Sequence, residues 1–559
     1  MISHAPEPPA SPVPHLTRLG GRSLLLIALA AVGGASVIYY GTDWGPWAFS
    51  DGVGYIVNAR NLVLGRGLGL FRASGEFIRL VSHPPLYSLL LAALGRVGID
   101  LVVAARWVDI LLFAVFLFVC AWGFFRLTGS GWVTAAFTGL LLFHPAILLA
   151  YLSAMSEPLF LACLMASLLF LSMYLVEGSR RDLLFASAAA SGALLTRYPG
   201  AALIIGGAVG LFLLESAGWK RRAKDSVIFA AIGTLPTAIF VIWSRWELQS
   251  RAPRGLKSTV DLITLVKSFT KQALNAVWTW KPIPPDVIPN SLIPSSYTRY
   301  VAAVLAVLIL GVLVVSLVKA WQWRRQAAAE PNPALMWRPA LMVGVFMVTY
   351  AAFFAGAYIV TSPTPDVDPR TLLPLLPSGI LFICLLAATG MRWAAHSRAL
   401  RAALATAAAL SLIGFAIISQ DTVFGMHRTG LGYTSRAWRA SDTIKAVGQL
   451  PTDLILVSNE APPILLYTDR SAYVIPGLEA GDTQPLSVPF GSTDSELDQA
   501  YRSGRAALVL FDNIDNQLKS GPAAGRGLTG ADLTRGLTAI FTGNDGSIYC
   551  QCQIERLGP

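Results

Sequence analysis

The chain has 559 residues, of which 54% are hydrophobic and only 13% are charged, and its mean hydropathy is +0.57. Average soluble domains carry about 25% charged residues, so this composition excludes an ordinary soluble enzyme and indicates a polytopic membrane protein. The formal net charge is +11. Because long apolar runs separate the basic residues, this charge concerns membrane orientation and anionic lipids, and nucleic acid is not expected as a partner.

The N-terminal 22 residues are rich in proline and end in Arg18 and Arg22, which predicts a disordered cytoplasmic tail over 1–22. Apolar runs long enough to cross a bilayer follow it. About eleven crossings are predicted, at 23–40, 101–125, 131–152, 158–176, 182–197, 199–215, 226–246, 300–320, 339–360, 371–390 and 402–420.

Basic residues in the short loops between these spans set the orientation. They fall on the same side as the N-terminal tail, and the positive-inside rule makes that side cytoplasmic. An odd number of spans then places the C-terminus outside a bacterial-type inner membrane. The longer segments 41–100 and 247–299 become outer loops of a transmembrane domain that covers 23–420.

Two charged groups lie within the predicted span at 101–125. Arg106 and Asp109 are three residues apart, a spacing that brings side chains together on a helix, so we expect them to pair with each other.

The composition changes after Gln420. The stretch DLILVSNEAPPILLYTDRSAYVIPG reads as strand, helix, turn and strand, and RAALVLFDN and GSIYCQCQIE read as further strands. A soluble extracytoplasmic α/β domain is therefore predicted over 421–559. Cys550 and Cys552 would share one face of the last strand, so we expect no disulfide bond between them.

The first outer loop contains AFSDGVGYIVNARNL, from Ala48 to Leu62. Ser50 or Asp51 can cap a helix that lies in the membrane interface with its apolar side in lipid. A second such helix is expected after His83, Pro84 and Pro85. Taken alone, Asp51 reads equally well as a catalytic acid or as a solvated cap residue, and Asp43 is a rival acid in the same loop.

A first span, an outer loop that opens with an acid, two interfacial helices and an H-P-P-L segment together resemble the GT-C superfamily of membrane glycosyltransferases. The pattern is most similar to the protein O-mannosyltransferase and aminoarabinose transferase group (glycosyltransferase family 39-like). Three later stretches agree: MSEPLFLACLMASLLF at 155–170, LLTRYPGAALIIGG at 194–207 and DPRTLLPLLPSGILF at 368–382. The resemblance covers about residues 23–420.

The resemblance implies a polyprenyl-phosphate sugar as donor and Asp51 as the general base. The family often has Asp-Glu at this point, whereas this chain has Asp51-Gly52, and the aminoarabinose enzymes have Lys where this chain has His83. His83 is expected near the donor phosphate, where a neutral imidazole can donate a hydrogen bond or hold a metal. A divalent metal ion stays open as a cofactor, and no metal ligands are assigned.

The other candidates lie near the predicted outer ends of spans. Arg197 and Arg370 suit a phosphate because a guanidinium donates two parallel hydrogen bonds, although both are also placed to reach lipid headgroups. Glu157 is expected to orient the acceptor or a metal; alternatively it is a helix N-terminal acid favoured by the dipole. Tyr55 is expected to share the orienting role.

The function predicted from the sequence is transfer of a sugar from a polyprenyl phosphate to an acceptor hydroxyl of a lipid, glycan or protein, at the outer face of the membrane. Direct attack with a single base would invert the anomeric centre. Two other hypotheses are a transporter or lipid-linked-sugar flippase without transferase chemistry, and a membrane scaffold that presents the outer domain.

Overall fold

The computed structural model describes residues 16–71, 77–79, 84–248, 255–256, 261–283, 337–362, 364–393, 398–475, 478, 499–501, 503–520 and 529–552. These residues form two compact units. The first contains 1–38, 109–151 and 156–423, and the second contains 39–108, 152–155 and 424–559. The second unit thus joins the first outer loop to the C-terminal segment.

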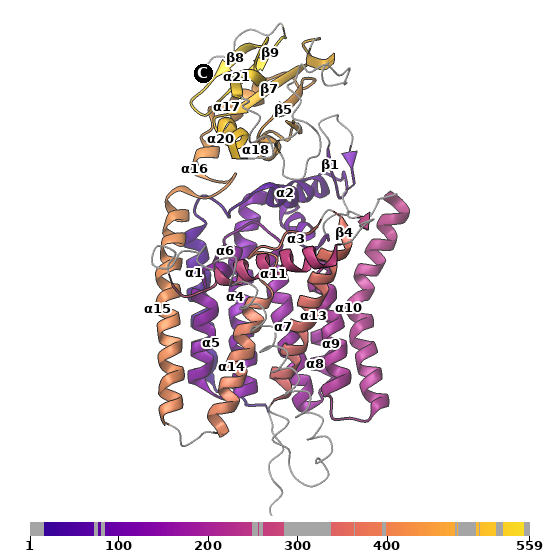
Figure 1. Ribbon diagram of the computed structural model, residues 1–559, viewed down its shortest axis with the longest axis vertical. Helices are drawn as coiled ribbons and strands as arrows, with labels where there is room; N and C mark the ends of the chain where they lie inside the picture. Colours follow the sequence, from indigo (N-terminus) through magenta and orange to yellow (C-terminus); the bar gives the residue numbers. More distant parts are fainter. Residues whose placement is uncertain are drawn as a thin grey trace, which may run out of the picture. The chain divides into compact units, whose positions relative to one another are not determined.

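Apolar helices make up the first unit. The helices that lie wholly within it are α5 (Gly131–Phe143), α6 (Pro145–Tyr151), α7 (Glu157–Glu177), α8 (Arg180–Thr196), α9 (Gly200–Leu214), α10 (Trp219–Leu248), α11 (Leu262–Trp278), α13 (Arg338–Val360) and α14 (Leu375–Trp393). Two short strands, β3 (Gly255–Leu256) and β4 (Thr361–Ser362), pair antiparallel. Contacts join α7 to α8, α8 and α9 to α10, and α9 to α13, and these helices run side by side in Figure 1.

Three long helices have residues in both units: α1 (Gly21–Gly41), α4 (Leu101–Thr128) and α15 (Arg398–Thr429). Within the described residues, six helices are long and apolar enough to cross a membrane: α1, α4, α7, α10, α13 and α15. The α5–α6 pair, bent by 61°, adds a seventh when it counts as one span. The protein is therefore a polytopic helical membrane protein.

The predicted number of about eleven crossings is larger than this. A helix covers each predicted span within the described residues, but α8 with 17 residues and α9 with 15 are short for a crossing. The apolar part of α14 is also short, at Leu375–Met391. The predicted span at 300–320 lies outside the described residues.

The pairing predicted between Arg106 and Asp109 is wrong. Arg106 instead donates to the carbonyl oxygen of Tyr39 at 2.9 Å and pairs with Asp43 at 3.4 Å. A long basic side chain near a helix end reaches toward the polar end of the helix. Asp109 is fully buried, and neither of its carboxyl oxygens has a hydrogen-bond partner.

The C-terminal segment folds as an α/β domain, as predicted. Its five-stranded sheet has the order β6-β5-β7-β9-β8, in which β5 is parallel to β6 and β7 while β9 is antiparallel to β7 and β8. The strands are β5 (Ile455–Ser458), β6 (Ala472–Val474), β7 (Ala506–Phe511), β8 (Thr538–Thr542) and β9 (Gly546–Cys550). The helices are α16 (Arg436–Arg439), α17 (Asp442–Gln449), α18 (Ala461–Thr468), α20 (Ile514–Ser520) and α21 (Gly530–Leu533).

Strand β7 is buried at every position, because helices cover both faces of the sheet. Its alternate side chains enter two hydrophobic clusters, one with α17 and α18 and the other with α20 and α21. This is the alternation expected for a central strand. The sequence pattern did not predict β8 or α17.

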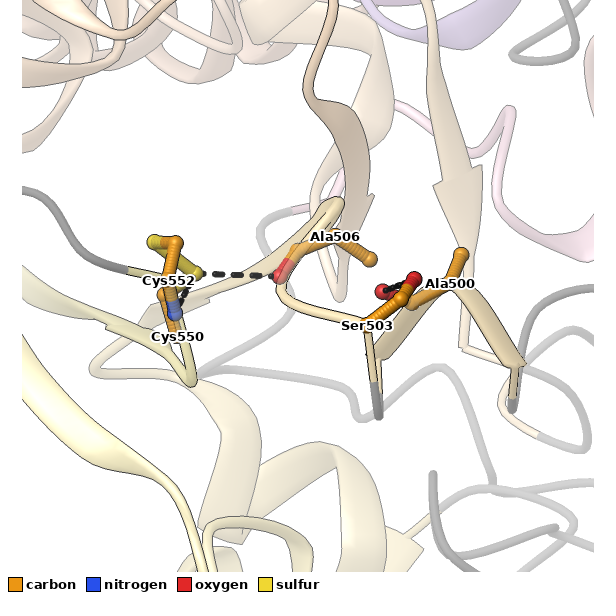
Figure 2. The surroundings of a disulfide bond; sticks show 5 residues. All are labelled: Ala500, Ser503, Ala506, Cys550 and Cys552. Carbon is orange, nitrogen blue, oxygen red and sulfur yellow. Dashed lines mark hydrogen bonds between the residues drawn. A yellow bond between two sulfur atoms is a disulfide. The ribbon is translucent and has the colours of Figure 1, made fainter.

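Cys550 and Cys552 form a disulfide bond, contrary to the prediction (Figure 2). The expectation assumed a fully extended strand through both residues. Instead β9 ends at Cys550 and the chain bends, so the two Cα atoms are 5.2 Å apart, within the range for a disulfide. The Cys550 sulfur lies 3.3 Å from the carbonyl oxygen of Ala506 on the neighbouring strand.

The segment 41–100, which the sequence predicts to be the first outer loop, contains the helices α2 (Ser50–Val63) and α3 (Leu86–Gly95) and the antiparallel strands β1 (Leu70–Phe71) and β2 (Phe77–Ile78). The residue before α2 is Phe49, which makes no side-chain cap, so neither Ser50 nor Asp51 is the N-cap. Both the apolar residue Ile56 and the polar residue Asn61 are buried. Protein therefore covers the side of α2 that was expected to face lipid.

Candidate functional site

Glu157 is the first residue of α7, and its side chain is only 5% exposed. Pro158 fixes the entry to the helix, and an acid in the first turn is favoured by the helix dipole. The local sequence Ser-Glu-Pro therefore explains why a helix begins here. It does not explain why a carboxylate is buried, and the reason lies in two distant arginines.

Arg197 ends α8. Its backbone is extended, and its amide donates to the carbonyl oxygen of Ala193, so the side chain leaves the helix in the short connection to α9. Arg197 Nη1 forms an ion pair with Glu157 Oε1 and lies 3.4 Å from the hydroxyl of Ser156. The connection thus directs a guanidinium at the start of α7.

Arg370 comes from the turn before α14. In that turn the amide of Thr371 donates to Oδ1 of Asp368 at 2.6 Å, and the amide of Asp368 donates to the Thr371 hydroxyl at 3.0 Å. These bonds fix the backbone on both sides of Arg370. The Nε of Arg370 donates to Oε1 of Glu157, the same oxygen that Arg197 contacts.

The resulting cluster has two guanidinium groups for one carboxylate, a formal charge of +1. The Arg197 side chain is 20% exposed and that of Arg370 is 32% exposed, so both cations are partly withdrawn from water. Electrostatic interactions are stronger in such a setting than on an open surface. The cluster is therefore suited to an anion, and a phosphate matches the planar fork of arginine.

The three residues line a small cavity of about 20 Å³, together with Phe160, Leu161, Pro199, Tyr350, Phe354, Thr371, Leu373 and Pro374. This volume holds about one water molecule. A sugar phosphate is larger, so its entry requires the long arginine side chains to move. Oε2 of Glu157 is buried and has no hydrogen-bond partner, which leaves an acceptor for a bound hydroxyl or water.

Tyr350 was not predicted from the sequence. It is buried in α13, lines the cavity, and its hydroxyl donates to the carbonyl oxygen of Thr371 at 2.8 Å, so it holds the turn that carries Arg370. The sequence gives no signal for this role, because Tyr350 is simply an aromatic residue in the middle of the apolar run 339–360.

Asp51 and Tyr55 belong to the second unit. Asp51 is in the first turn of α2 and is half-buried. Tyr55 follows one turn later, is 4% exposed and packs edge-on against Tyr87 with ring centroids 5.3 Å apart. The structure brings together Glu157, Arg197 and Arg370; Asp51 and Tyr55 form a separate group on one helix, and His83 lies outside the described residues.

Gly52, which occupies the position of the family's second acid, has a structural explanation. A Cβ atom at this position would lie 2.9 Å from the carbonyl oxygen of Ala154, closer than real Cβ atoms come. A glutamate cannot be accommodated without moving that backbone. The second acid of the family pattern is therefore excluded by packing in this chain.

The sequence left open Asp43 as a rival acid and a divalent metal ion as a cofactor. Asp43, the rival acid, pairs with Arg106, and its side chain is 55% exposed.

Within the described residues, no group of three or more His, Cys, Asp or Glu side chains is arranged to hold a metal ion. The Glu157 cluster does not fit a divalent metal either, because two guanidinium groups already neutralise its single carboxylate.

Residues 82–246 match the family model described as dolichyl-phosphate-mannose-protein mannosyltransferase. This match includes Glu157 and Arg197. Two solved structures of ArnT from Cupriavidus metallidurans, each 15% identical, have a similar fold. The structure bound to undecaprenyl phosphate has a TM-score of 0.52 and covers 97% of this chain and 100% of that chain. The apo structure has a TM-score of 0.51, and the match covers 95% of this chain and 98% of that chain.

The chain has the GT-C fold. The similarity to ArnT extends over nearly the whole length of both chains, so it includes the C-terminal domain as well as the helices. No curated protein has a sequence that matches this chain significantly.

Proposed function

We propose that this GT-C protein is a glycosyltransferase that moves a sugar from a polyprenyl-phosphate donor to an acceptor hydroxyl. The observation that carries the proposal is the pair of arginines, Arg197 and Arg370, gathered at Glu157 in a fold shared with an ArnT structure that holds undecaprenyl phosphate. The two guanidinium groups bind the phosphate of the donor, and His83 adds a hydrogen bond to it.

The charge of the leaving group supports this role for the arginines. The donor phosphate is a diester with one negative charge, and it becomes a monoester that carries a second charge as the bond to the sugar breaks. Cations aimed at the developing charge lower the barrier, because they interact more strongly with the transition state than with the bound donor. The cluster of Arg197, Arg370 and Glu157 has a net charge of +1, which strengthens its attraction for the more negative leaving group.

Asp51 is the general base of the proposed reaction. It takes the proton of the acceptor hydroxyl while the hydroxyl oxygen bonds to the anomeric carbon and the carbon–phosphate oxygen bond breaks. Attack from the face opposite the phosphate inverts the anomeric centre. Asp43 is less suited to this role, since its carboxylate is already engaged by Arg106.

Glu157 and Tyr55 orient the acceptor. The free Oε2 of Glu157 accepts a hydrogen bond from an acceptor hydroxyl, and the segment Leu152–Met155, which pairs with Trp47 just before α2, continues through Ser156 into Glu157. The acceptor is a lipid, a glycan or a protein.

The distribution of charge supports an outer-face reaction in a bacterial-type inner membrane. Glu157 begins α7, whereas Arg180 and Arg181 follow its far end; at 1.5 Å per residue, the 21 residues of α7 separate them by about 30 Å, the thickness of a bilayer core. The positive-inside rule makes the arginine end cytoplasmic. Together with an odd number of crossings, this orientation makes the N-terminus cytoplasmic and the C-terminal domain extracytoplasmic.

The experiment that tests the proposal is incubation of the purified protein with a panel of polyprenyl-phosphate sugars. Mass spectrometry then follows loss of the sugar from the lipid and its appearance on water or an acceptor. We expect turnover with one donor class. Absence of turnover with every donor, under conditions in which a control GT-C enzyme works, contradicts the proposal.

A further inference from the structure

The N-terminal approach to α2 is bonded to the C-terminal segment. The amide of Tyr433 donates to the carbonyl oxygen of Ala48 at 2.8 Å, and the hydroxyl of Thr434 donates to the carbonyl oxygen of Pro46 at 2.6 Å. Gly432 has a φ of +61°, and a Cβ there would lie 2.2 Å from the Ala48 oxygen. This contact admits only glycine, so the backbone three residues before Asp51 is held closely.

The C-terminal end of α2 is bonded to helix α18 of the C-terminal segment. Arg60 donates from Nη1 to the carbonyl oxygen of Leu465 at 3.2 Å and from Nη2 to that of Leu466 at 2.8 Å. Its Nη1 also pairs with Asp469 Oδ1 at 3.1 Å. The last carbonyl groups of a helix have no partner within the helix, and a basic side chain can satisfy them.

Asp469 is held from two positions of the first outer loop. Its second carboxyl oxygen pairs with Arg66 at 3.4 Å. With a φ of +55°, Asp469 is the only non-glycine residue in the left-handed region among the residues that the structure describes. Next to it, the hydroxyl of Ser471 donates to the carbonyl oxygen of Phe71 at 2.6 Å. Ion pairs and hydrogen bonds thus converge on the turn after α18.

Helix α18 also connects the two anchored ends of α2. Its N-cap is Glu460, whose Oε2 accepts from the hydroxyl of Tyr433 at 2.7 Å, and Tyr433 is the residue bonded to Ala48. Its last turn receives Arg60. A helix of eight residues therefore links the start and the end of α2 through hydrogen bonds at its own two ends.

We propose that the C-terminal domain is a clamp that positions α2, and that Arg60 is a positioning residue for Asp51. The proposal rests on the proposed function for its catalytic part, in which Asp51 is the base. Fixing both ends of a 14-residue helix fixes the carboxylate on its first turn. A small displacement of a catalytic group is sufficient to slow a reaction strongly.

The test uses hydrogen exchange and kinetics on the purified full-length protein. Arg60→Ala removes two carbonyl contacts and one ion pair, and Arg60→Lys retains the charge but lacks the fork that reaches all three partners. Lys445→Ala is the matched control, since it removes an exposed ion pair of 3.1 Å with Asp442 in the same unit without touching α2. All variants are first compared with the wild type by gel filtration and melting temperature.

With Arg60→Ala we expect backbone amides of residues 50–63 to exchange roughly tenfold faster, because charge-assisted contacts are lost. We also expect kcat of sugar transfer to fall roughly tenfold at an unchanged donor KM. Arg60→Lys should show smaller changes in both, and Lys445→Ala none. If Arg60→Ala does not fold, Arg60→Lys and Asp469→Asn provide the same comparison.

Unchanged exchange over 50–63 in a folded Arg60 variant overturns the clamp. Faster exchange with unchanged kcat overturns the positioning role of Arg60. If the wild type transfers sugar from no donor, the proposed function fails, while the exchange measurement still decides whether the C-terminal domain holds α2.

Discussion

Glu157 and Arg370 lie 213 residues apart in the sequence, and they form an ion pair within the helical unit. The pair ties the turn before α14 to the first residue of α7, and Arg197 joins it from the end of α8. Because one carboxylate holds two cations, the positions of both guanidinium groups depend on Glu157.

Replacing Arg370 is expected to weaken donor binding. Hydrogen bonds to charged groups contribute about 1.5–3 kcal/mol, so Arg370→Ala should lower kcat/KM for the donor by roughly 10- to 100-fold, through a lower kcat as well as a higher KM. Arg370→Lys should recover only part of this, since an ammonium cannot donate two parallel bonds. Steady-state kinetics measure the effect, with Arg181→Ala at the start of α8 as the control for a lost surface charge. An unchanged kcat/KM in the Ala variant would remove Arg370 from the phosphate site.

Replacing Glu157 is expected to make stability depend on phosphate. Glu157→Gln leaves two guanidinium groups close together without a counter-charge, which should lower the free energy of unfolding by about 3–5 kcal/mol. An anion can replace the missing charge. Melting temperatures in inorganic phosphate and in chloride at equal ionic strength should therefore differ more for the variant than for the wild type. Equal phosphate effects on both proteins would argue against an anion site.

Adding one methyl group at residue 52 is expected to damage the start of α2. Gly52→Ala places a Cβ 2.9 Å from the Ala154 carbonyl oxygen and should destabilise the fold by about 1–3 kcal/mol. Gly54→Ala is the matched control on the same helix, because no atom lies within 4 Å of its Cβ position. Thermal unfolding of both variants measures the difference. Equal stability would show that the close approach of α2 to residue 154 is not maintained.

The disulfide bond is expected to protect two of the five cysteines from alkylation. In protein purified without reductant, a maleimide under denaturing conditions should label Cys120, Cys163 and Cys384 but not Cys550 or Cys552. The loop that this bond closes is very short, so Cys550→Ser/Cys552→Ser should cost only about 1–2 kcal/mol. Mass spectrometry of the labelled peptides decides; complete labelling of all five cysteines would contradict an oxidising, extracytoplasmic location of this domain.

Much of the fold could be predicted from local pattern. Long apolar runs gave the helices, and short apolar runs bounded by turn residues gave β5, β6, β7 and β9, because these signals depend on neighbours in the sequence. The disulfide was missed because the prediction extended β9 past Cys550, through Cys552. The pairing of Arg106 with Asp109 was wrong because a long side chain can reach Asp43, a residue far away in sequence.

The candidate site was predicted only in part. Each of Glu157, Arg197 and Arg370 was recognisable as a charge near the end of an apolar run. Their convergence on one oxygen depends on how distant helices pack, and no local spacing contains that information. Tyr350 was missed for the same reason, since its hydrogen bond to the backbone of Thr371 depends on the tertiary structure. The exclusion of a side chain at Gly52 likewise comes from a segment about a hundred residues away.

The most direct test of the account is sugar transfer by Asp51→Asn, with Asp43→Asn as its matched control. The substitution keeps the size of the side chain and removes its ability to accept a proton. The account predicts that Asp51→Asn binds the polyprenyl-phosphate sugar with wild-type affinity but transfers it at least roughly a thousandfold more slowly, whereas Asp43→Asn retains transfer. Wild-type turnover by the Asp51 variant would contradict the account.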